Sequence, residues 1–181
     1  MDDWTQDVGE VLLEEEVIRA KVKEIARRIE DDHQDGDILL VCVLRGAVIF
    51  FSDLIRALDL PVSVDFIAVS SYGASTKSSG QVRLIKDLEA SIEGRHVILV
   101  EDIVDTGLTL SYLLRNLGNR NPSSLQVCSL LSKPSRRKVE VPVEYIGFEI
   151  EDQFVVGYGL DFDQRFRNLP YIGVYSPGSD H

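Results

Sequence analysis

The chain has 181 residues, of which 44% are hydrophobic, and a formal net charge of -11 at pH 7. This length suits one domain spanning residues 1–181, because it allows one substantial core but not two independent ones. The negative charge argues against nucleic-acid partners, and the sequence has neither a membrane-spanning apolar run nor a basic secretory leader, so we expect a cytoplasmic protein.

The first part of the chain alternates between helical and extended patterns. Apolar residues recur at three- and four-residue spacing within residues 14–32, which predicts an amphipathic helix. A continuous aliphatic run at 37–44 predicts a strand that is covered on both faces. A second helix is expected at 47–58 and a second strand at 62–69.

The alternation continues after a polar stretch at 70–80, which predicts a mobile loop. We expect strands at 82–85 and 96–100, a helix at 109–117 and a further strand at 125–131. Such alternation indicates right-handed crossovers between parallel strands. The sequence therefore predicts an α/β fold with a mostly parallel central sheet flanked by helices, and ligands beyond the carboxyl ends of its strands.

Several residues of reactive type have ordinary structural explanations. Cys42 and Cys128 each lie in an apolar stretch, so we expect them to be packed in the core rather than to bind metal. The histidines stand apart without the spacing of zinc ligands, which argues against a zinc-dependent or histidine-based mechanism. The basic run at 135–138 is adequately explained as a solvated turn.

The densest group of chemically useful residues follows the apolar strand at 96–100. Glu101 and Asp102 are adjacent carboxylates at the expected end of that strand, and the segment Asp105 to Thr109 leads from there into a helix. Free N–H groups at the start of a helix, together with threonine hydroxyls, favour a phosphate group. Paired carboxylates can orient hydroxyls or a hydrated Mg2+ ion. The pattern therefore predicts a site for a phosphorylated ligand.

An alternative explanation is that Glu101 and Asp102 are ordinary charges at a strand end and that Asp105 only caps a helix. A lone pair of carboxylates would deserve that interpretation. Here four apolar residues, two acids, two more apolar residues, Asp-Thr-Gly and a hydroxyl form a far more constrained string, which favours the functional interpretation.

The segment from Val100 to Thr109 is similar to the 5-phosphoribosyl pyrophosphate (PRPP) motif of type I phosphoribosyltransferases, in their hypoxanthine-guanine branch. Over roughly residues 10 to 175, further segments resemble the family's other motifs in the family's order. They are a pyrophosphate loop at Leu44 to Ala47, a mobile catalytic flap from Ser71 and Tyr72 to Gly80, a purine-reading Lys133, the run Phe154 to Asp161, and Phe166-Arg167.

The resemblance implies the type I phosphoribosyltransferase fold, with a core at about residues 14–147. A small hood at about 148–181, completed by part of the N-terminal segment, would bind the base. Family members are dimers or tetramers, which implies a homodimer or homotetramer here.

The resemblance also implies how PRPP would be held. Glu101 and Asp102 would bind the ribose hydroxyls and the Mg2+ shell, and Asp161 would bind a second Mg2+ ion. The 5-phosphate would lie in a cradle formed by Asp105, Thr106, Gly107, Leu108 and Thr109. The pyrophosphate would be held by Arg45, Gly46 and Arg167.

For the purine, the resemblance implies that Asp105 exchanges a proton with a ring nitrogen as the base attacks. Lys133 would point at the 6-oxo group, which disfavours adenine because its amine is also a donor. Phe154 would stack on the ring, and backbone groups at Val155 and Asp161 would read its edge.

Three of these residues also have an ordinary structural interpretation. Lys133 could be a solubilising charge at a strand end. Phe154 could belong to the core, and Arg167 could be half of a surface ion pair.

Two positions depart from the family's commonest pattern. Many relatives have lysine where this chain has Arg45, and the family's loop has a non-proline cis peptide before that residue, which the sequence alone does not establish here. Leu108 stands where the animal enzymes have lysine, and bacterial members often have an apolar residue there, so the chain resembles the bacterial type.

The implied activity is purine salvage, in which the 5-phosphoribosyl group of PRPP moves to N9 of hypoxanthine or guanine. The products would be IMP or GMP and pyrophosphate. Two alternatives stay open: a non-catalytic regulator on the same fold that senses PRPP or a nucleotide, and a phosphoribosyltransferase that prefers xanthine or another 6-oxopurine.

Overall fold

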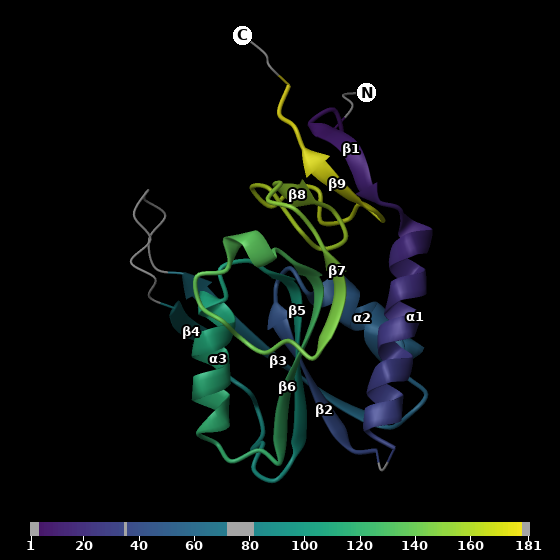
Figure 1. The fold of residues 1–181 in the computed structure, drawn as a ribbon. Coiled ribbons are helices and arrows are strands. Elements are labelled where there is room, and N and C mark those ends of the chain that lie inside the picture. Colours follow the sequence, from purple (N-terminus) through teal and green to yellow (C-terminus); the bar gives the residue numbers. More distant parts are fainter. Residues whose placement is uncertain (1–3, 35, 72–81, 179–181) are drawn as a thin grey trace.

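The computed structural model describes residues 4–34, 36–71 and 82–178 (Figure 1). Within these ranges, the elements in chain order are β1 (Val8–Leu13), α1 (Glu15–Asp32), β2 (Ile38–Leu44), α2 (Val48–Ala57), β3 (Val62–Ser71), β4 (Val82–Lys86), β5 (His96–Val104), α3 (Leu108–Gly118), β6 (Ser124–Ser132), the 3-10 turn η1 (Pro134–Arg136), β7 (Tyr145–Glu149), β8 (Val155–Val156) and β9 (Ile172–Tyr175).

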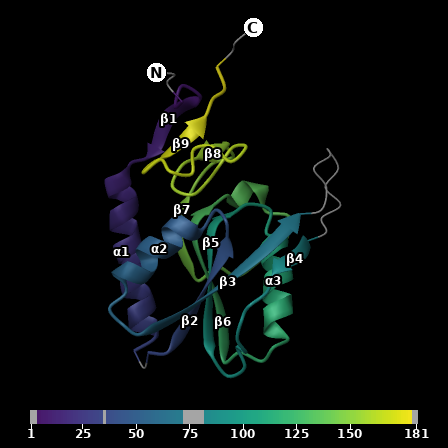
Figure 2. The same cartoon turned by 180° about the vertical axis from the view of Figure 1, so that it is seen from behind.

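The larger of two sheets has six strands in the order β4-β3-β2-β5-β6-β7. Strands β2, β3, β5, β6 and β7 run parallel, and the edge strand β4 runs antiparallel to β3. Figures 1 and 2 show α1 and α2 along one face of this sheet and α3 along the other. The α/β fold with a mostly parallel central sheet is therefore confirmed.

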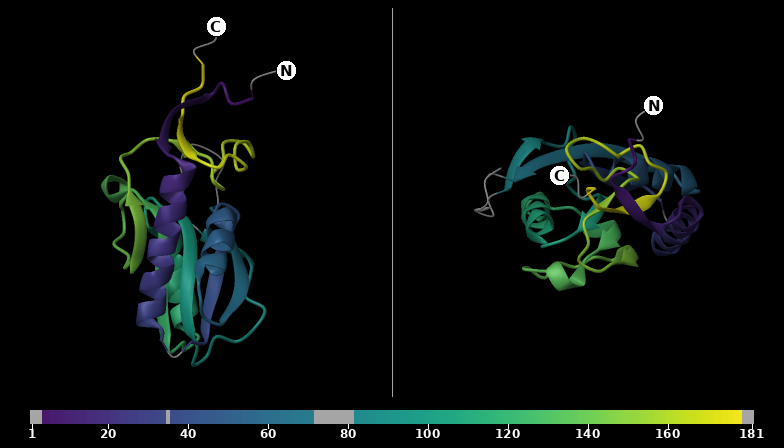
Figure 3. Two further views of the ribbon diagram at one scale, coloured as in Figure 1. Left: turned by 90° about the vertical axis from the view of Figure 1, so that its right-hand side faces the viewer. Right: turned by 90° about the horizontal axis from the view of Figure 1, so that it is seen from above.

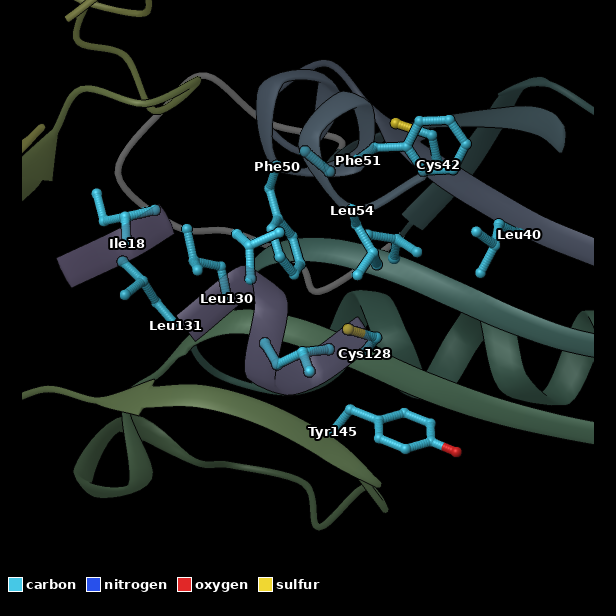
Figure 4. Close-up of a cluster of buried hydrophobic side chains, with 14 of the residues drawn as sticks. Ile18, Leu40, Cys42, Phe50, Phe51, Leu54, Cys128, Leu130, Leu131 and Tyr145 are labelled. Atoms are coloured by element: carbon cyan, nitrogen blue, oxygen red, sulfur yellow. The ribbon is translucent and has the colours of Figure 1, made fainter. Parts of the chain in front are cut away.

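Strand β2 illustrates why the sheet is covered on both faces. Successive residues of a strand point to opposite sides, so its even-numbered residues pack with α1 and α2 while its odd-numbered residues pack with α3. Figure 4 shows the first of these two clusters, where side chains of β2 and β6 meet those of α1 and α2. Cys42 and Cys128 are buried free thiols in this cluster, which confirms their predicted packing role.

The smaller sheet is antiparallel and joins the beginning of the chain to its end. Its strand order is β1-β9-β8, and β1 pairs Val8 with Tyr175 and Leu13 with Ile172. We call this sheet, together with residues 150–171, the hood. Figures 1 and 3 show the hood at the end of the larger sheet where the chain leaves β5 and β6. It therefore lies over the edge at which ligands were expected.

Three expectations from the sequence need correction or completion. Strand β5 does not end at Val100 but continues to Val104, because it stays paired with β6. Phe148, which we assigned to the hood, lies in β7 and pairs with Leu131 in the larger sheet. The hood strands β1, β8 and β9 were not predicted, since each is short and lacks a clear alternating pattern.

The predicted loop at 70–80 falls mostly outside the described residues, although its first two residues belong to β3. In the described part of the chain, the helices are all too short or too polar to cross a membrane.

Candidate active site

The paired carboxylates lie inside strand β5 rather than after it. Glu101 is buried and Asp102 is partly buried. Burial raises the pKa of Glu101 well above its usual range, and the charge of Asp102 raises it further. Burial also raises the pKa of Asp102. Two carboxyl groups removed from water in this way favour a cation or hydroxyl donors as partners.

The loop after β5 has the shape of an anion cradle. Helix α3 begins at Leu108, and Gly107 before it has φ 83°, a left-handed conformation that suits glycine. A Cβ atom at Gly107 would collide with the carbonyl oxygen of Val139. The N-cap residue Gly107 has no side chain to cap α3, and the hydroxyl of Thr106 accepts the N–H of Leu108 at a long 3.4 Å. This start of a helix therefore suits an anion.

A second segment fixes the same loop from outside. The N–H groups of Lys138 and Val139 donate to the carbonyl oxygen of Thr106 at 2.9 and 3.1 Å. Arg137 donates to the carbonyl oxygen of Asp105 at 2.9 Å. The cradle is therefore preorganised by hydrogen bonds to its backbone carbonyl groups before any ligand arrives.

The loop between β2 and α2 touches the carboxylates directly. The peptide bond between Leu44 and Arg45 is cis, which answers the question that the sequence left open. A Cβ atom at Gly46 would overlap Oδ2 of Asp102, so the absence of a side chain at this position lets the loop contact the carboxylate.

These segments enclose a cavity of about 260 Å3. Its wall combines the ends of β2, β3 and β5 with the start of α3, and it is lined by Val43, Leu44, Gly46, Val69, Glu101, Asp102, Ile103, Val104, Asp105, Thr106, Gly107, Thr109 and Leu110. The structure thus brings together Gly46, both acids and most of the predicted phosphate cradle.

The hood closes on this region through Arg167 and its neighbours. Arg167 donates to the carbonyl oxygen of Gly159 at 2.7 Å and lies 2.9 Å from a carboxylate oxygen of Asp161. Arg45 donates to the side chain of Gln164 at 3.1 Å. Arg167 therefore does form an ion pair, but the pair is only a quarter exposed and lies within the hood. The link to the β2–α2 loop is Gln164, whose side-chain oxygen accepts from both Arg167, at 3.3 Å, and Arg45.

Lys133 and Phe154 do not fit the ordinary structural interpretations, a surface charge and a core residue. Lys133 is only 7% exposed, so it is not a solubilising surface charge, and its backbone N–H donates to the carbonyl oxygen of Val104 at 2.9 Å. Phe154 is 54% exposed, so it is not a core residue. Val155 is buried in β8 and pairs with Val174 of β9.

Phe154 is held by two further aromatic rings of the hood. Its ring lies edge-on to Phe162 at 5.9 Å and to Tyr175 at 5.7 Å, and those two rings stack on each other at 4.2 Å. Sequence reasoning missed this group, because its members come from three separate stretches and carry no shared motif.

The basic run at 135–138 begins in an exposed 3-10 turn, as predicted, but its arginines also have contacts that the sequence analysis missed. Arg136 donates from Nε to a carboxylate oxygen of Asp105 at 3.1 Å, and Arg137 reaches the hydroxyl of Ser132 at 2.8 Å as well as the backbone of the cradle. The available signal was position, since the run follows the strand beside β5 and must emerge at the same edge of the sheet.

The predicted flap begins at Ser71 and Tyr72. Ser71 ends strand β3, and Tyr72 lies outside the described residues.

The fit of a metal ion depends on the substrate. In the described ranges, no three His, Cys, Asp or Glu side chains gather into a metal-binding group. Glu101 and Asp102 nevertheless fit a Mg2+ ion that substrate oxygens also bind, because Mg2+ keeps several waters and takes one or two carboxylates. Asp161 fits less well, since its oxygens already pair with Arg167 and accept the N–H of Gln164 at 2.8 Å.

Comparison with known proteins adds an independent line of evidence. A family model described as the phosphoribosyl transferase domain matches residues 10–163. A protein named hypoxanthine-guanine phosphoribosyltransferase from Mycobacterium avium is 54% identical over 177 residues, covering 94% of this chain and 87% of that protein. The protein of the same name from Bacillus subtilis is 50% identical over 171 residues, covering 94% of this chain and 95% of that one.

The fold is also similar to a solved structure. The crystal structure of a hypoxanthine phosphoribosyltransferase from Staphylococcus aureus matches with a TM-score of 0.90 and 46% sequence identity, covering 94% of this chain and 93% of that chain.

Proposed function

The chain belongs to the phosphoribosyl transferase domain family and has the type I phosphoribosyltransferase fold, and from this premise we propose that it is an enzyme of purine salvage. It transfers the 5-phosphoribosyl group of PRPP to N9 of hypoxanthine or guanine, giving IMP or GMP and pyrophosphate. Relatives with this activity in their names are 50% and 54% identical over most of the chain.

One geometric observation carries the proposal. Lys133 is buried, and its backbone is bonded to Val104, the residue just before the cradle. Lys133, a cation suited to a 6-oxo group, therefore lies at the end of β6. The neighbouring strand β5 leads into the proposed phosphate-binding loop. A purine and a sugar phosphate held at these two strand ends would meet between them.

The sugar phosphate is bound mainly by backbone groups. The N–H groups at the start of α3 and the hydroxyls of Thr106 and Thr109 receive the 5-phosphate. Glu101 and Asp102 accept from the ribose hydroxyls, and Arg45, Gly46 and Arg167 face the pyrophosphate. Bound Mg2+ supplies neutralisation of the charge on the leaving pyrophosphate.

Asp105 is the proton acceptor in this proposal. As the purine nitrogen attacks, its N–H proton passes to the Asp105 carboxylate, and the bond between the sugar and pyrophosphate breaks. The same anion stabilises the positive charge that develops on the sugar. The Asp105 carboxylate accepts a hydrogen bond from Arg136, and this contact supports the proposed role because it holds the carboxylate beside a positive charge.

Specificity for a 6-oxopurine follows from Lys133. Its ammonium group donates to a carbonyl oxygen but would meet a second donor in adenine. Lys133→Ala should therefore reduce the preference for hypoxanthine over adenine, measured as the ratio of the two kcat/KM values. An unchanged ratio would remove this role from Lys133.

The remaining parts of the proposal concern closure and assembly. The flap from Ser71 and Tyr72 would cover the reacting centre and exclude water that could hydrolyse the sugar. We expect a homodimer or homotetramer, which sedimentation of the purified protein can distinguish. A cytoplasmic location is supported by the two free thiols, which suit a reducing compartment.

The deciding experiment is a substrate screen. Hypoxanthine, guanine, xanthine, adenine and pyrimidines are each incubated with PRPP and Mg2+, and pyrophosphate release is measured. Release with hypoxanthine or guanine supports the proposal, and a clear preference for xanthine supports the related transferase instead. Tight binding of PRPP or a nucleotide without any release supports the non-catalytic regulator.

A further inference from the structure

The 3-10 turn η1 brings two cations together beside the cradle. The N–H of Arg136 donates to the carbonyl oxygen of Lys133 at 3.1 Å, and residues three apart in such a turn lie on the same side. Neighbouring like charges repel each other, most strongly where water is partly excluded. The Lys133 side chain is only 9% exposed, so this pair of cations needs an anion.

Asp152, in the hood segment between β7 and β8, supplies that anion. One of its carboxylate oxygens lies 3.7 Å from the Lys133 ammonium, and the other lies 3.7 Å from the Arg136 guanidinium. A single carboxylate thus bridges the two cations with one oxygen each. Among the described residues, these are the ion pairs found for Asp152.

The bridge extends to the proposed proton acceptor. Arg136 also binds Asp105, from Nε to a carboxylate oxygen at 3.1 Å. Lys133, Asp152, Arg136 and Asp105 therefore form one row of alternating charges, which we call the charge row. Its two ends are the residue proposed to recognise the purine and the residue proposed to take its proton.

We propose that Asp152 and Arg136 are positioning residues: Asp152 fixes the Lys133 ammonium for the 6-oxo group, and Arg136 orients the Asp105 carboxylate for the ring nitrogen. This inference rests on the proposed function. The row lets the enzyme hold its two purine contacts at one spacing, because a displacement of either end is resisted by the charges between them.

The row also accommodates the proton transfer. When Asp105 accepts the proton from the purine nitrogen, its carboxylate becomes neutral and its attraction to Arg136 weakens. Arg136 remains a cation and already lies near Asp152, so it keeps an anionic partner throughout. No other charge has to move as the sugar–pyrophosphate bond breaks.

The test compares Asp152→Asn with Glu151→Gln, its neighbour, which is also exposed and loses the same charge. Asp152→Asn should raise KM for hypoxanthine about 10-fold. This loss is larger than that expected for an exposed ion pair and smaller than that expected for a buried one. KM for PRPP should stay within about twofold, since the cradle is untouched. Glu151→Gln should leave both constants near the wild-type values.

A second pair of variants tests the other half of the row. Arg136→Gln should lower kcat with hypoxanthine about 10-fold, whereas the matched change Arg27→Gln, at an exposed arginine of α1, should not. In the double variant Asp152→Asn/Arg136→Gln the loss in kcat/KM should be smaller than the product of the single losses, because both break one row. Asp152→Glu keeps the negative charge, so its KM for hypoxanthine should stay close to that of the wild type. This variant keeps the test valid if Asp152→Asn folds poorly.

The outcomes separate the inference from its premise. If the wild type forms no IMP or GMP, the proposed function fails and the inference fails with it. If the wild type is active but Asp152→Asn matches Glu151→Gln, or the two single losses multiply, the proposed function stands and the charge row is overturned.

Discussion

The phosphate cradle and the hood contribute to the same site in opposite ways. The cradle is a contiguous segment, Asp105 to Thr109, whose proposed ligand-binding groups are mostly backbone atoms fixed by the end of β5 and the start of α3. The hood is assembled from strands at both ends of the chain, and it contributes side chains. A local sequence pattern can encode the first kind of structure, whereas the second exists only after the chain has folded.

The largest effect should come from Asp105 of the cradle, which is linked to Asp152 of the hood through Arg136. Asp105→Asn should lower the single-turnover rate with PRPP and hypoxanthine about 100-fold or more, because the amide cannot accept the proton. Asp163→Asn, an exposed change of the same kind in the hood, is the matched control. A near-normal rate for Asp105→Asn would show that another group takes the proton.

The contact between Gly46 and Asp102 tests how rigid the cradle side is. A methyl group at Gly46 must displace the Asp102 carboxylate, so Gly46→Ala should reduce kcat/KM for PRPP about 30-fold, as expected for overpacking of roughly 2 kcal/mol. A Cβ at Gly118 would have no heavy atom within 4 Å, so Gly118→Ala serves as the control. Equal kinetics for the two variants would contradict the close packing of this loop.

The cradle side was largely predictable from sequence for a physical reason. Long apolar runs identify buried strands, and an abrupt change from apolar residues to Glu101-Asp102 and Asp105-Thr106-Gly107 marks the functional edge of the sheet. The end of β5 was misplaced by four residues, because continued pairing with β6 outweighs the polar side chains at Glu101 and Asp102.

The hood side was predictable only through family resemblance. Strand β8 has two residues and β9 has four, too short for a periodic signal, and β1 has exposed residues at its centre. The contacts of Arg136 with Asp105 and of Asp152 with Lys133 join side chains from separate loops. Local composition cannot distinguish such residues from solvated charges, so Arg136 was assigned to an ordinary turn.

Burial of Glu101 predicts that its negative charge lowers the stability of the folded protein, although the same charge is proposed to strengthen PRPP binding. A raised folded-state pKa means that stability is present when the carboxyl is protonated and is lost as pH rises above the usual value for glutamate. Glu101→Gln should therefore raise the free energy of unfolding at pH 8 by on the order of 1 kcal/mol. The gain should shrink toward pH 4.5.

Chemical denaturation of the ligand-free protein at both pH values measures this difference. PRPP binding should weaken in the same variant, since the ribose hydroxyls lose a charged acceptor. A variant that is less stable than the wild type at pH 8 would show that Glu101 is compensated by partners in the folded protein.

The smallest effect is expected for the aromatic rings of the hood that contact Phe154. Changing one of them tests whether packing between these rings supports the proposed purine site. Tyr175→Leu removes the ring that contacts both Phe154 and Phe162, so Phe154 loses an edge that fixes its orientation. One such aromatic pair contributes about 0.5–1.5 kcal/mol, which predicts an increase of about threefold in KM for hypoxanthine. KM for PRPP should not change, because the cradle is held by β5, α3 and residues 137–139 rather than by the hood. Tyr175→Phe keeps the ring and should behave as the wild type; if it matches Tyr175→Leu instead, the hydroxyl rather than the ring supports the purine site.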